Sequence, residues 1–201
     1  MNANVSEINI DKQRQEILDA AHNRFLTYGF GKTTMAEIAE DVSMSAANLY
    51  RYFQNKQDIA AACADRCICS RNDRVREAIR QSHLTATQRL HTFALESYRH
   101  NAEMMKDTPK INELVENVSS HDPQMIQQKI KALVALIAEI LAYGNETGEF
   151  AVDDIVSTAE TIYSALILFD VPIFIHLFSA EEFEKKANGV VDLIIEGIRK
   201  R

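Results

Sequence analysis

The residues whose types and spacing could do chemistry are concentrated in segment 34–56. Two small residues, Ala46 and Ala47, are followed there by Asn48, whose side-chain amide can both donate and accept hydrogen bonds. At a helix start, such residues let the backbone approach base edges in a DNA major groove, where an Asn amide pairs with adenine and an Ala methyl contacts the thymine methyl. Side chains that can reach phosphates or adjacent bases follow directly: Tyr50, Arg51 and Tyr52.

The same segment contains the signals that would position these side chains. Thr34 and Glu37 form a capping box, in which each side chain satisfies a free backbone N–H, and this predicts a short helix over Met35–Asp41. Ser45 is a favourable N-cap residue and predicts a second short helix over about 46–53. Two short helices separated by a tight turn form a helix-turn-helix. The expected chemistry is recognition of double-stranded DNA.

This segment resembles the N-terminal DNA-binding module of TetR-type (tetracycline-repressor-like) transcription regulators. Their pattern is roughly Thr-x-x-x-Ile-Ala, nine intervening residues, Leu-Tyr-x-Tyr-Phe and then Lys, and this chain matches it with Thr34, Ile38, Ala39, Leu49, Tyr50, Tyr52, Phe53 and Lys56. The family usually has Gly where this chain has Ser43, and Ser in a left-handed turn costs on the order of 1 kcal/mol. The resemblance is specific over about residues 12–60.

The resemblance implies a DNA-binding role for particular residues. Phosphate contacts are implied for Thr34, Tyr50 and Lys56. Base-facing positions are implied for Ala36, Ala46, Ala47, Asn48 and Tyr52. Ser45 and Arg51 complete the predicted DNA-binding set. Because acidic residues outnumber basic ones among residues 1–60, the affinity must come from dimerisation and from a local basic stripe of Lys32, Arg51 and Lys56.

The composition of the whole chain favours an all-α protein. Its 201 residues are 46% hydrophobic and 7% aromatic, with no Trp and few Gly or Pro, and charged residues are spaced among apolar ones at helical intervals. The net charge of −7 argues against a nonspecific nucleic-acid coat. The N-terminus lacks signal-peptide features, and no segment has the ~18 uninterrupted apolar residues of a membrane span. We therefore expect a cytoplasmic protein with no membrane partner.

Helix signals divide the chain into about nine helices and three parts. Residues 1–10 are predicted to form a flexible N-terminal arm, residues 11–54 a three-helix DNA-binding domain with the helix-turn-helix, and residues 55–201 a regulatory domain for ligand binding and dimerisation. The first helix is expected over about 12–28, and a helix over about 55–82 should bridge the two domains as a lever. Later helices are expected to begin near Ala86, Pro109, Pro123, Asp154 and Ser179, with a kink or break at Pro172.

The last two predicted helices have apolar residues on more than one face. Such a helix must be buried twice, so one face can pack within the subunit and the other against a two-fold partner. This predicts a homodimer, which the resemblance also implies. The candidate interface residues lie on both helices: Ile155, Ile162, Leu166, Phe183, Ala187, Val190, Val191, Ile194 and Ile198.

The resemblance also implies a pocket for a small-molecule effector among the C-terminal helices. Its candidate wall residues are Phe93, Tyr98, Met104, Met105, Leu114, Val118, Leu133, Ile137, Tyr163 and Phe169. Residues of these types at helical spacing are also typical of ordinary core packing. Polar residues that could select a ligand show no diagnostic spacing: Arg99, His100, Glu139, Tyr143 and Asp170. Mostly apolar walls favour a hydrophobic or aromatic effector.

The sequence therefore favours a homodimeric repressor that leaves a palindromic operator when an effector changes the spacing of its recognition helices. One alternative is a thiol- or metal-responsive regulator that uses Cys63, Cys67 and Cys69, although their spacing is no recognised zinc site. Another is an all-α carrier or enzyme. Because the chain has no nucleophile–base, metal or phosphate-loop pattern, we expect no catalytic residue, metal or cofactor.

Overall fold

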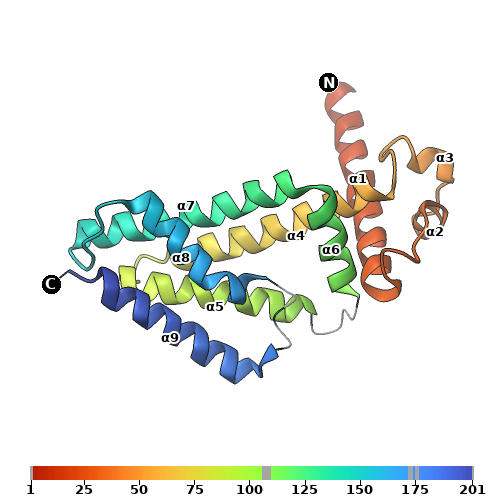
Figure 1. Cartoon of the computed structure of the whole chain (residues 1–201). Helices are drawn as coiled ribbons and strands as arrows, with labels where there is room; N and C mark the ends of the chain where they lie inside the picture. Colours follow the sequence, from red (N-terminus) through yellow and green to blue (C-terminus); the bar gives the residue numbers. More distant parts are fainter. Residues whose placement is uncertain (1, 106–109, 172–173, 175–176, 201) are drawn as a thin grey trace. The chain divides into compact units, whose positions relative to one another are not determined.

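The computed structural model describes the backbone of residues 2–105, 110–171, 174 and 177–200, and their side chains except those of residues 2–8, 104, 105, 111 and 112. In these described ranges the regular elements are nine α-helices, which confirms the predicted all-α class (Figure 1). The chain packs as two compact units. Unit 1 comprises residues 1–67 and 107–125, and unit 2 comprises residues 68–106 and 126–201.

Unit 1 contains the predicted helix-turn-helix. Its helices are α1 (Asn2–Tyr28), α2 (Met35–Asp41), α3 (Ala46–Leu49), the first half of α4 (Lys56–Ile79) and α6 (Ile111–His121). Helix α2 packs against both α1 and α3, and α6 packs against α1. The buried apolar residues of this unit include Ile17, Ala21, Phe25, Ile38, Leu49, Phe53 and Ile59. The expected boundary at residues 54 and 55 thus falls inside a packed unit, to which α6 also belongs.

Two helix boundaries in unit 1 differ from the predictions. Helix α1 begins at Asn2, so residues 2–10 are its first turns rather than a separate arm. No Gly or Pro interrupts the sequence from Asn2 to Tyr28, which allows the helix to continue outward. Helix α3 ends at Leu49 rather than near Phe53. The chain tightens there, because the N–H of Arg51 bonds to the carbonyl of Asn48 at 3.1 Å, three residues earlier.

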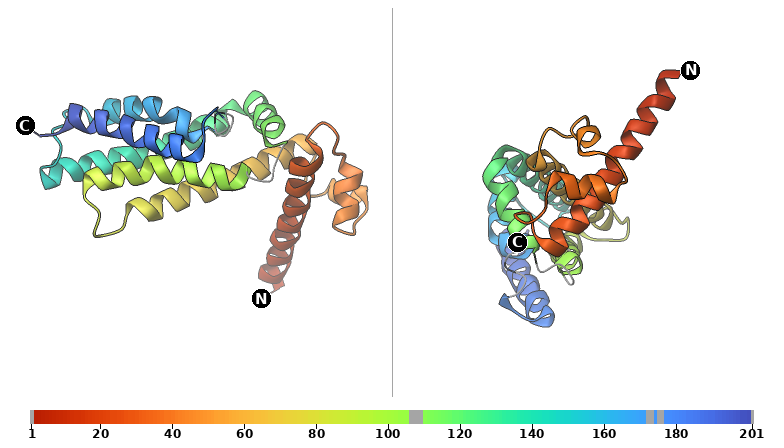
Figure 2. Two further views of the ribbon diagram at one scale, coloured as in Figure 1. Left: turned by 90° about the horizontal axis from the view of Figure 1, so that it is seen from below. Right: turned by 90° about the vertical axis from the view of Figure 1, so that its right-hand side faces the viewer.

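Unit 2 is a bundle formed by the second half of α4 with α5 (Ala86–Met105), α7 (Pro123–Thr147), α8 (Ile155–Asp170) and α9 (Ala180–Ile198). Helix α5 lies beside both α8 and α9, and α8 also packs against α9 (Figure 2). Their apolar faces meet in one core cluster. Its members include Leu90, Phe93, Leu133, Ile137, Ile140, Ile162, Leu166, Phe169, Phe183 and Val191.

Local capping chemistry explains where the helices of unit 2 begin. The side chain of Asp154 accepts a hydrogen bond from the N–H of Ser157 at 3.0 Å, and Ser179 and Glu182 form the predicted capping box of α9. Helix α7 starts at Pro123, as predicted. The expected helix start at Pro109 and the expected kink at Pro172 lie outside the described residues. Every helix in the described part of the chain is too short or too polar to cross a lipid bilayer.

Candidate DNA-binding interface

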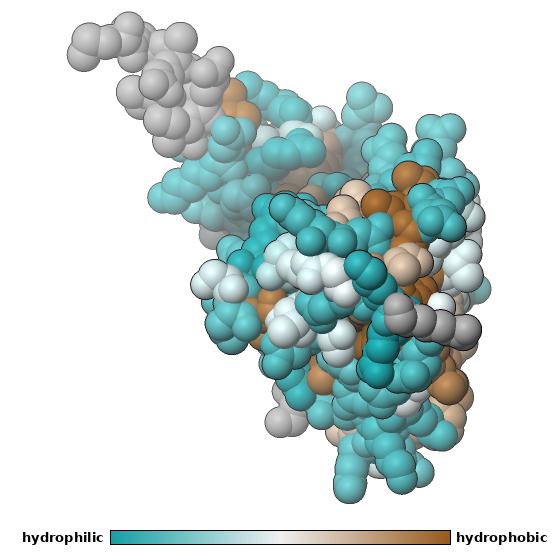
Figure 3. Space-filling view, turned by 90° about the vertical axis from the view of Figure 1, so that its left-hand side faces the viewer, coloured by the Kyte–Doolittle hydropathy of each residue, from teal (hydrophilic) through white to brown (hydrophobic). Residues whose placement is uncertain are grey.

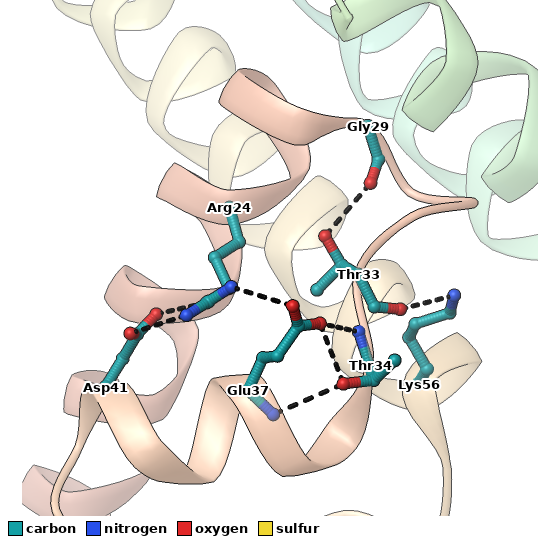
Figure 4. Close-up of polar contacts among 7 residues, drawn as sticks. All are labelled: Arg24, Gly29, Thr33, Thr34, Glu37, Asp41 and Lys56. Carbon is teal, nitrogen blue, oxygen red and sulfur yellow. Dashed lines mark hydrogen bonds and ion pairs between the residues drawn. The ribbon is translucent and has the colours of Figure 1, made fainter.

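The capping box at the start of α2 has the predicted geometry (Figure 4). The backbone N–H of Thr34 donates to Oε2 of Glu37 at 2.8 Å, and Oγ1 of Thr34 accepts from the N–H of Glu37 at 3.3 Å. The hydroxyl of Thr34 also donates to Oε2 of Glu37 at 2.7 Å. These bonds fix the first turn of α2 and lower the pKa of Glu37. The start of α2 is therefore firmly set, although both residues remain accessible.

Arg24 on α1 offsets the acidic charge of α2. Its guanidinium forms two hydrogen bonds with the carboxylate of Asp41, and its Nη1 lies 3.4 Å from Oε1 of Glu37 (Figure 4). The bond from Arg24 lowers the pKa of Asp41, so this carboxylate stays ionised and paired. Because two acids of α2 face an arginine, their repulsion of a phosphate backbone is reduced.

The turn between α2 and α3 presents the start of the recognition helix. Ser43 has a φ of 52°, the left-handed conformation expected at this position. Ser45 then caps α3, because its Oγ accepts a hydrogen bond from the N–H of Asn48 at 3.2 Å. Leu49 and Phe53 are buried and anchor the helix from behind. The small residues of α3 are therefore held at the surface of unit 1 by a rigid turn.

The predicted DNA-binding residues are accessible to different degrees. Six of them are exposed: Thr34, Ala36, Ser45, Ala47, Tyr50 and Arg51. Four are half-buried: Ala46, Asn48, Tyr52 and Lys56. The exposed set lies at the start of α2, at the start of α3 and in the two residues that follow α3, and Tyr50 has 52% of its surface exposed, which leaves its ring and hydroxyl accessible to a partner. The small side chains let the protein backbone come close to DNA, and the polar side chains beside them can form hydrogen bonds with it.

Lys56 holds the loop before α2. Its Nζ donates to the carbonyl oxygens of Phe30 and Thr33, both at 2.7 Å, and lies 4.3 Å from the centre of the Phe30 ring. Thr33 in turn donates its hydroxyl to the carbonyl of Gly29 at 2.9 Å (Figure 4). The ammonium has three N–H donors, and the loop takes two of them. Lys56 thus positions the entry to the helix-turn-helix, a role that its sequence position did not reveal.

Two further residues support this surface and were missed in the sequence. Arg14 on α1 donates to the carbonyl of Tyr52 at 3.0 Å and lies 4.1 Å from the centre of the Phe53 ring. Glu113 on α6 accepts a hydrogen bond from the N–H of Gly31 at 2.5 Å. Neither lies within the helix-turn-helix pattern, so only the three-dimensional packing could identify them.

The predicted pocket residues do not all belong to one core. Leu114 and Val118 are buried in unit 1, because α6 packs against α1, and they do not line the core of unit 2. The side chains of Met104 and Met105 lie outside the described ones. The remaining residues are buried in unit 2: Phe93, Tyr98, Leu133, Ile137, Tyr163 and Phe169. The ring of Tyr98 stacks on that of Phe183 at 4.8 Å, and Phe169 meets Phe183 edge-on at 5.7 Å.

The residues predicted for a dimer interface lie mostly inside unit 2. Five are buried in its own core: Ile162, Leu166, Phe183, Ala187 and Val191. Four are half-buried against that core: Ile155, Val190, Ile194 and Ile198. These four keep part of their surface exposed, and the most exposed large apolar residues of α8 and α9 are Val156, Ile167 and Leu193. Hydrophobic residues are visible on the molecular surface among hydrophilic ones (Figure 3).

Two of the three cysteines, Cys63 and Cys67, are poorly suited to thiolate chemistry, whereas Sγ of the half-buried Cys69 accepts a hydrogen bond from Nζ of Lys129 at 3.1 Å. Cys63 is fully buried, and burial raises the pKa of its thiol to about 12. Burial also raises the pKa of Cys67, whose Sγ lies 3.9 Å from Nδ1 of His22. Among the described residues, no group of three or more His, Cys, Asp or Glu is arranged to hold a metal ion.

Comparisons with known proteins cover both units. The family described as "Bacterial regulatory proteins, tetR family" matches residues 17–63, and the family described as "Tetracyclin repressor-like, C-terminal domain" matches residues 86–191. The HTH-type transcriptional regulator YvkB of Bacillus subtilis (strain 168), itself uncharacterized, is 26% identical over 137 residues, which span 66% of this chain and 72% of YvkB.

Solved structures share the fold over almost the whole chain. A candidate TetR-family transcriptional regulator from Mesorhizobium loti MAFF303099 has a TM-score of 0.77 at 18% identity, covering 94% of this chain and 98% of that one. A transcriptional regulator from Cytophaga hutchinsonii ATCC 33406 has a TM-score of 0.70 at 26% identity, covering 91% of this chain and 96% of that one. With a capped helix-turn-helix in unit 1 and family matches in both units, the chain belongs to the TetR family of bacterial transcription regulators.

Proposed function

We propose that the chain is a homodimeric repressor that binds a palindromic DNA operator and leaves it when a small, mainly hydrophobic molecule binds unit 2. The observation that carries this proposal is the exposed surface of α2 and α3. Thr34, Tyr50 and Arg51 offer donors to phosphates there, while Ala47 leaves room for close approach to base edges. Half-buried Asn48 lies between them in the chain and is the candidate for pairing with adenine.

The dimer is proposed to form through the solvent-facing sides of α8 and α9. Val156 and Leu193 have 64% and 76% of their surfaces exposed, and Ile167 is also exposed. Exposed apolar residues on adjacent helices are an association surface, and a two-fold axis would place each helix pair against its copy. Two half-sites would double the phosphate contacts, which supports binding by a chain with a net charge of −7.

Release by an effector is proposed to act through α4. This helix is continuous from Lys56 to Ile79, contributes its first half to unit 1 and its second half to unit 2, and begins with the lysine that holds the loop before α2. A ligand that binds one conformation of unit 2 more tightly would raise the population of that conformation. Because α4 belongs to both units, this would also change the position of α4 and, in the dimer, the spacing of the two recognition helices.

The proposal is tested by selecting binding sites from a pool of randomised duplexes at two salt concentrations, followed by sequencing of the retained DNA. We expect a palindromic sequence whose half-sites are about one helical turn apart, or a small multiple of it. Retention without sequence preference, or no retention at either salt concentration, would refute a sequence-specific regulator. The selected duplex then serves as the probe for screening effectors by DNA release.

A further inference from the structure

A cluster of buried polar side chains interrupts the apolar core of unit 2. We call it the core polar cluster, and its members come from α4, α5 and α8: Arg71, Asn72, Ser97, Asn101, Tyr163 and Asp170. Apart from Tyr163, these residues are all of the polar and charged side chains that are buried among the described residues of unit 2. Buried polar groups that gather at one point of an apolar bundle are a feature of ligand sites.

Asp170 is the centre of the cluster. Its Oδ1 lies 3.0 Å from Nη1 of Arg71, and its Oδ2 accepts the hydroxyl of Tyr163 at 2.8 Å. Its backbone carbonyl accepts from Nδ2 of Asn101 at 2.6 Å and from Nη1 of Arg71 at 3.3 Å. Nε and Nη2 of Arg71 both donate to Oδ1 of Asn72, at 3.3 Å and 3.2 Å. The cluster therefore ties α4 and α5 to the last residue of α8.

Capping the C-terminus of α8 explains only some of the contacts in the core polar cluster. Arg71 and Asn101 cap the last carbonyl of the helix, which is an ordinary structural role. The carboxylate of Asp170 has no such role, because a negative charge at a helix C-terminus opposes the helix dipole. A buried ion pair also loses about as much in desolvation as it gains in attraction, so apolar residues would serve stability equally well. The charged side chains thus point to a role other than stability.

Two buried atoms in the cluster have no hydrogen-bond partner among the described residues: Oγ of Ser97 and Oδ1 of Asp170. Oδ1 is close enough to Arg71 for an ion pair, but the geometry is not that of a hydrogen bond. Ser97 has 2% of its surface exposed and lies one helical turn before Asn101, on the same face of α5. The Ser97 hydroxyl is therefore unsatisfied, and Oδ1 of Asp170 is ion-paired with Arg71 but accepts no hydrogen bond, so a ligand hydroxyl would satisfy both atoms.

These two atoms, which have no hydrogen-bond partner among the described residues, define what the ligand must offer. An ionised carboxylate can only accept hydrogen bonds, whereas a serine hydroxyl can donate and accept, so one ligand hydroxyl could donate to Asp170 and accept from Ser97. Arg71 and Asp170 already balance each other, so a charged ligand would leave one buried charge uncompensated. Helices α5 and α8, which carry Ser97 and Asp170, also carry Tyr98 and Phe169, and both rings pack on Phe183 to form an aromatic cluster in the same core for an apolar body.

We propose that the core polar cluster binds the hydroxyl of the effector, and that this effector is a small neutral molecule with a ring-sized apolar body and a phenolic or alcoholic hydroxyl group. The assignment rests on the proposed function of unit 2 as an effector domain and narrows its ligand class. The body of the ligand is then hydrophobic, as expected from the sequence, and its hydroxyl group is the part that the core polar cluster recognises.

The test compares four probes with one apolar body and different head groups: para-butylphenol, para-butylbenzoate, para-butylbenzylamine and butylbenzene. Their binding to the full-length protein is measured by ligand-observed NMR. We expect para-butylphenol to bind about tenfold more tightly than the other three, which corresponds to ~1.4 kcal/mol. Equal binding of butylbenzene and para-butylphenol, or no binding of any probe at millimolar concentration, overturns the inference.

Variants locate the site and separate recognition from stability. Ser97→Ala removes a hydroxyl that has no hydrogen-bond partner in the described part of the chain, so it should preserve folding, lower the affinity for para-butylphenol severalfold and leave butylbenzene unaffected. Asp170→Asn leaves Arg71 unbalanced, so the preference should change to para-butylbenzoate; exposed Asp153→Asn is its control. A phenol affinity unchanged by Ser97→Ala would overturn the site even if Asp170→Asn failed to fold. Selection of operator DNA is unaffected by these outcomes, so it tests the regulator function separately.

Discussion

Ser43 has a backbone conformation that suits glycine better than serine. Its φ of 52° lies in the left-handed region, where a β-carbon costs roughly 1–2 kcal/mol. We predict that Ser43→Gly stabilises the protein by about 1 kcal/mol and raises the midpoint of thermal unfolding by about 2–4 °C, because relief of this strain exceeds the added entropy of the unfolded chain. Differential scanning calorimetry measures both quantities.

Ser45 provides the matched control for Ser43→Gly. It is also a serine of the turn, but its φ is −74° and its Oγ caps α3. Ser45→Gly should therefore lower the unfolding midpoint, since it removes the cap without relieving strain. Equal midpoints for the two variants would show that the left-handed conformation of Ser43 is not strained.

A substitution at Lys56 can show whether its side chain positions the loop before α2 or contacts a DNA phosphate. Its ammonium donates to two loop carbonyls, so Lys56→Met should lower the free energy of unfolding by about 1–3 kcal/mol and also weaken DNA binding. Exposed Lys32→Met should leave the stability unchanged. Chemical denaturation measures the stability, and DNA titrations at several salt concentrations measure the salt dependence. Unchanged stability with a salt slope reduced by about one unit would instead identify Lys56 as a phosphate contact alone.

The short-range features of the site could be predicted from the sequence. The capping boxes at Thr34 and Ser179 involve residues only three positions apart, and a tight spacing of that kind determines local geometry. The role of Lys56 could not be predicted, because it depends on carbonyls of residues 30 and 33 that the fold brings to its side chain. The core polar cluster could be predicted only in part: the sequence offered Tyr163 and Asp170 as pocket residues, but Arg71, Asn72, Ser97 and Asn101 follow no motif and join them only through the fold.

Helix α6 contacts the entry to the helix-turn-helix through Glu113. This carboxylate accepts from the N–H of Gly31, and a β-carbon at Gly31 would lie only 2.9 Å from its Oε1. Because this loop leads directly into the cap of α2, Glu113→Ala should loosen α2 and reduce affinity for the selected operator by about tenfold. Fluorescence anisotropy of a labelled duplex measures the affinity.

Two other variants of α6 separate hydrogen bonding from charge. Glu113→Gln keeps an acceptor for Gly31 and should retain most of the affinity, whereas Glu116→Ala removes an exposed carboxylate from the same helix and should have little effect. If both alanine variants behaved alike, the contact with Gly31 would have no part in DNA binding. The packing of α6 could not be predicted from the sequence. Leu114 and Val118 are ordinary apolar residues, and nothing in their pattern indicates that they are buried in unit 1 rather than in unit 2.

At the scale of the whole molecule, the proposed function depends on the pairing of two chains. Leu193 on α9 has 76% of its surface exposed in the single chain, and a charge there should oppose association. We predict that Leu193→Glu converts the proposed dimer to a monomer and lowers operator affinity by at least about 100-fold, because one recognition helix must then bind alone. Sedimentation velocity and DNA titration report the two effects, and Glu181→Gln in the first turn of α9 is the control.

The amphipathic pattern predicted that α8 and α9 are buried twice, but it could not separate the inner face from the outer face. Phe183 and Val191 lie in the core of unit 2, whereas Leu193 reaches solvent. Both kinds of position carry similar apolar residues, so only packing against α5 distinguishes them. A dimeric Leu193→Glu variant with undiminished DNA affinity would place the interface elsewhere.

The central claim is that α3 reads base sequence, and the most direct measurement is a parallel selection of randomised duplexes by the wild-type protein and by Asn48→Ala. Asn48 stands at the start of α3 with its backbone fixed by Ser45, so its amide should read one or two positions of each half-site. We predict that the variant selects the same palindrome with relaxed preference at those positions alone. Identical preferences for both proteins, or no enrichment by the wild type, would contradict the account.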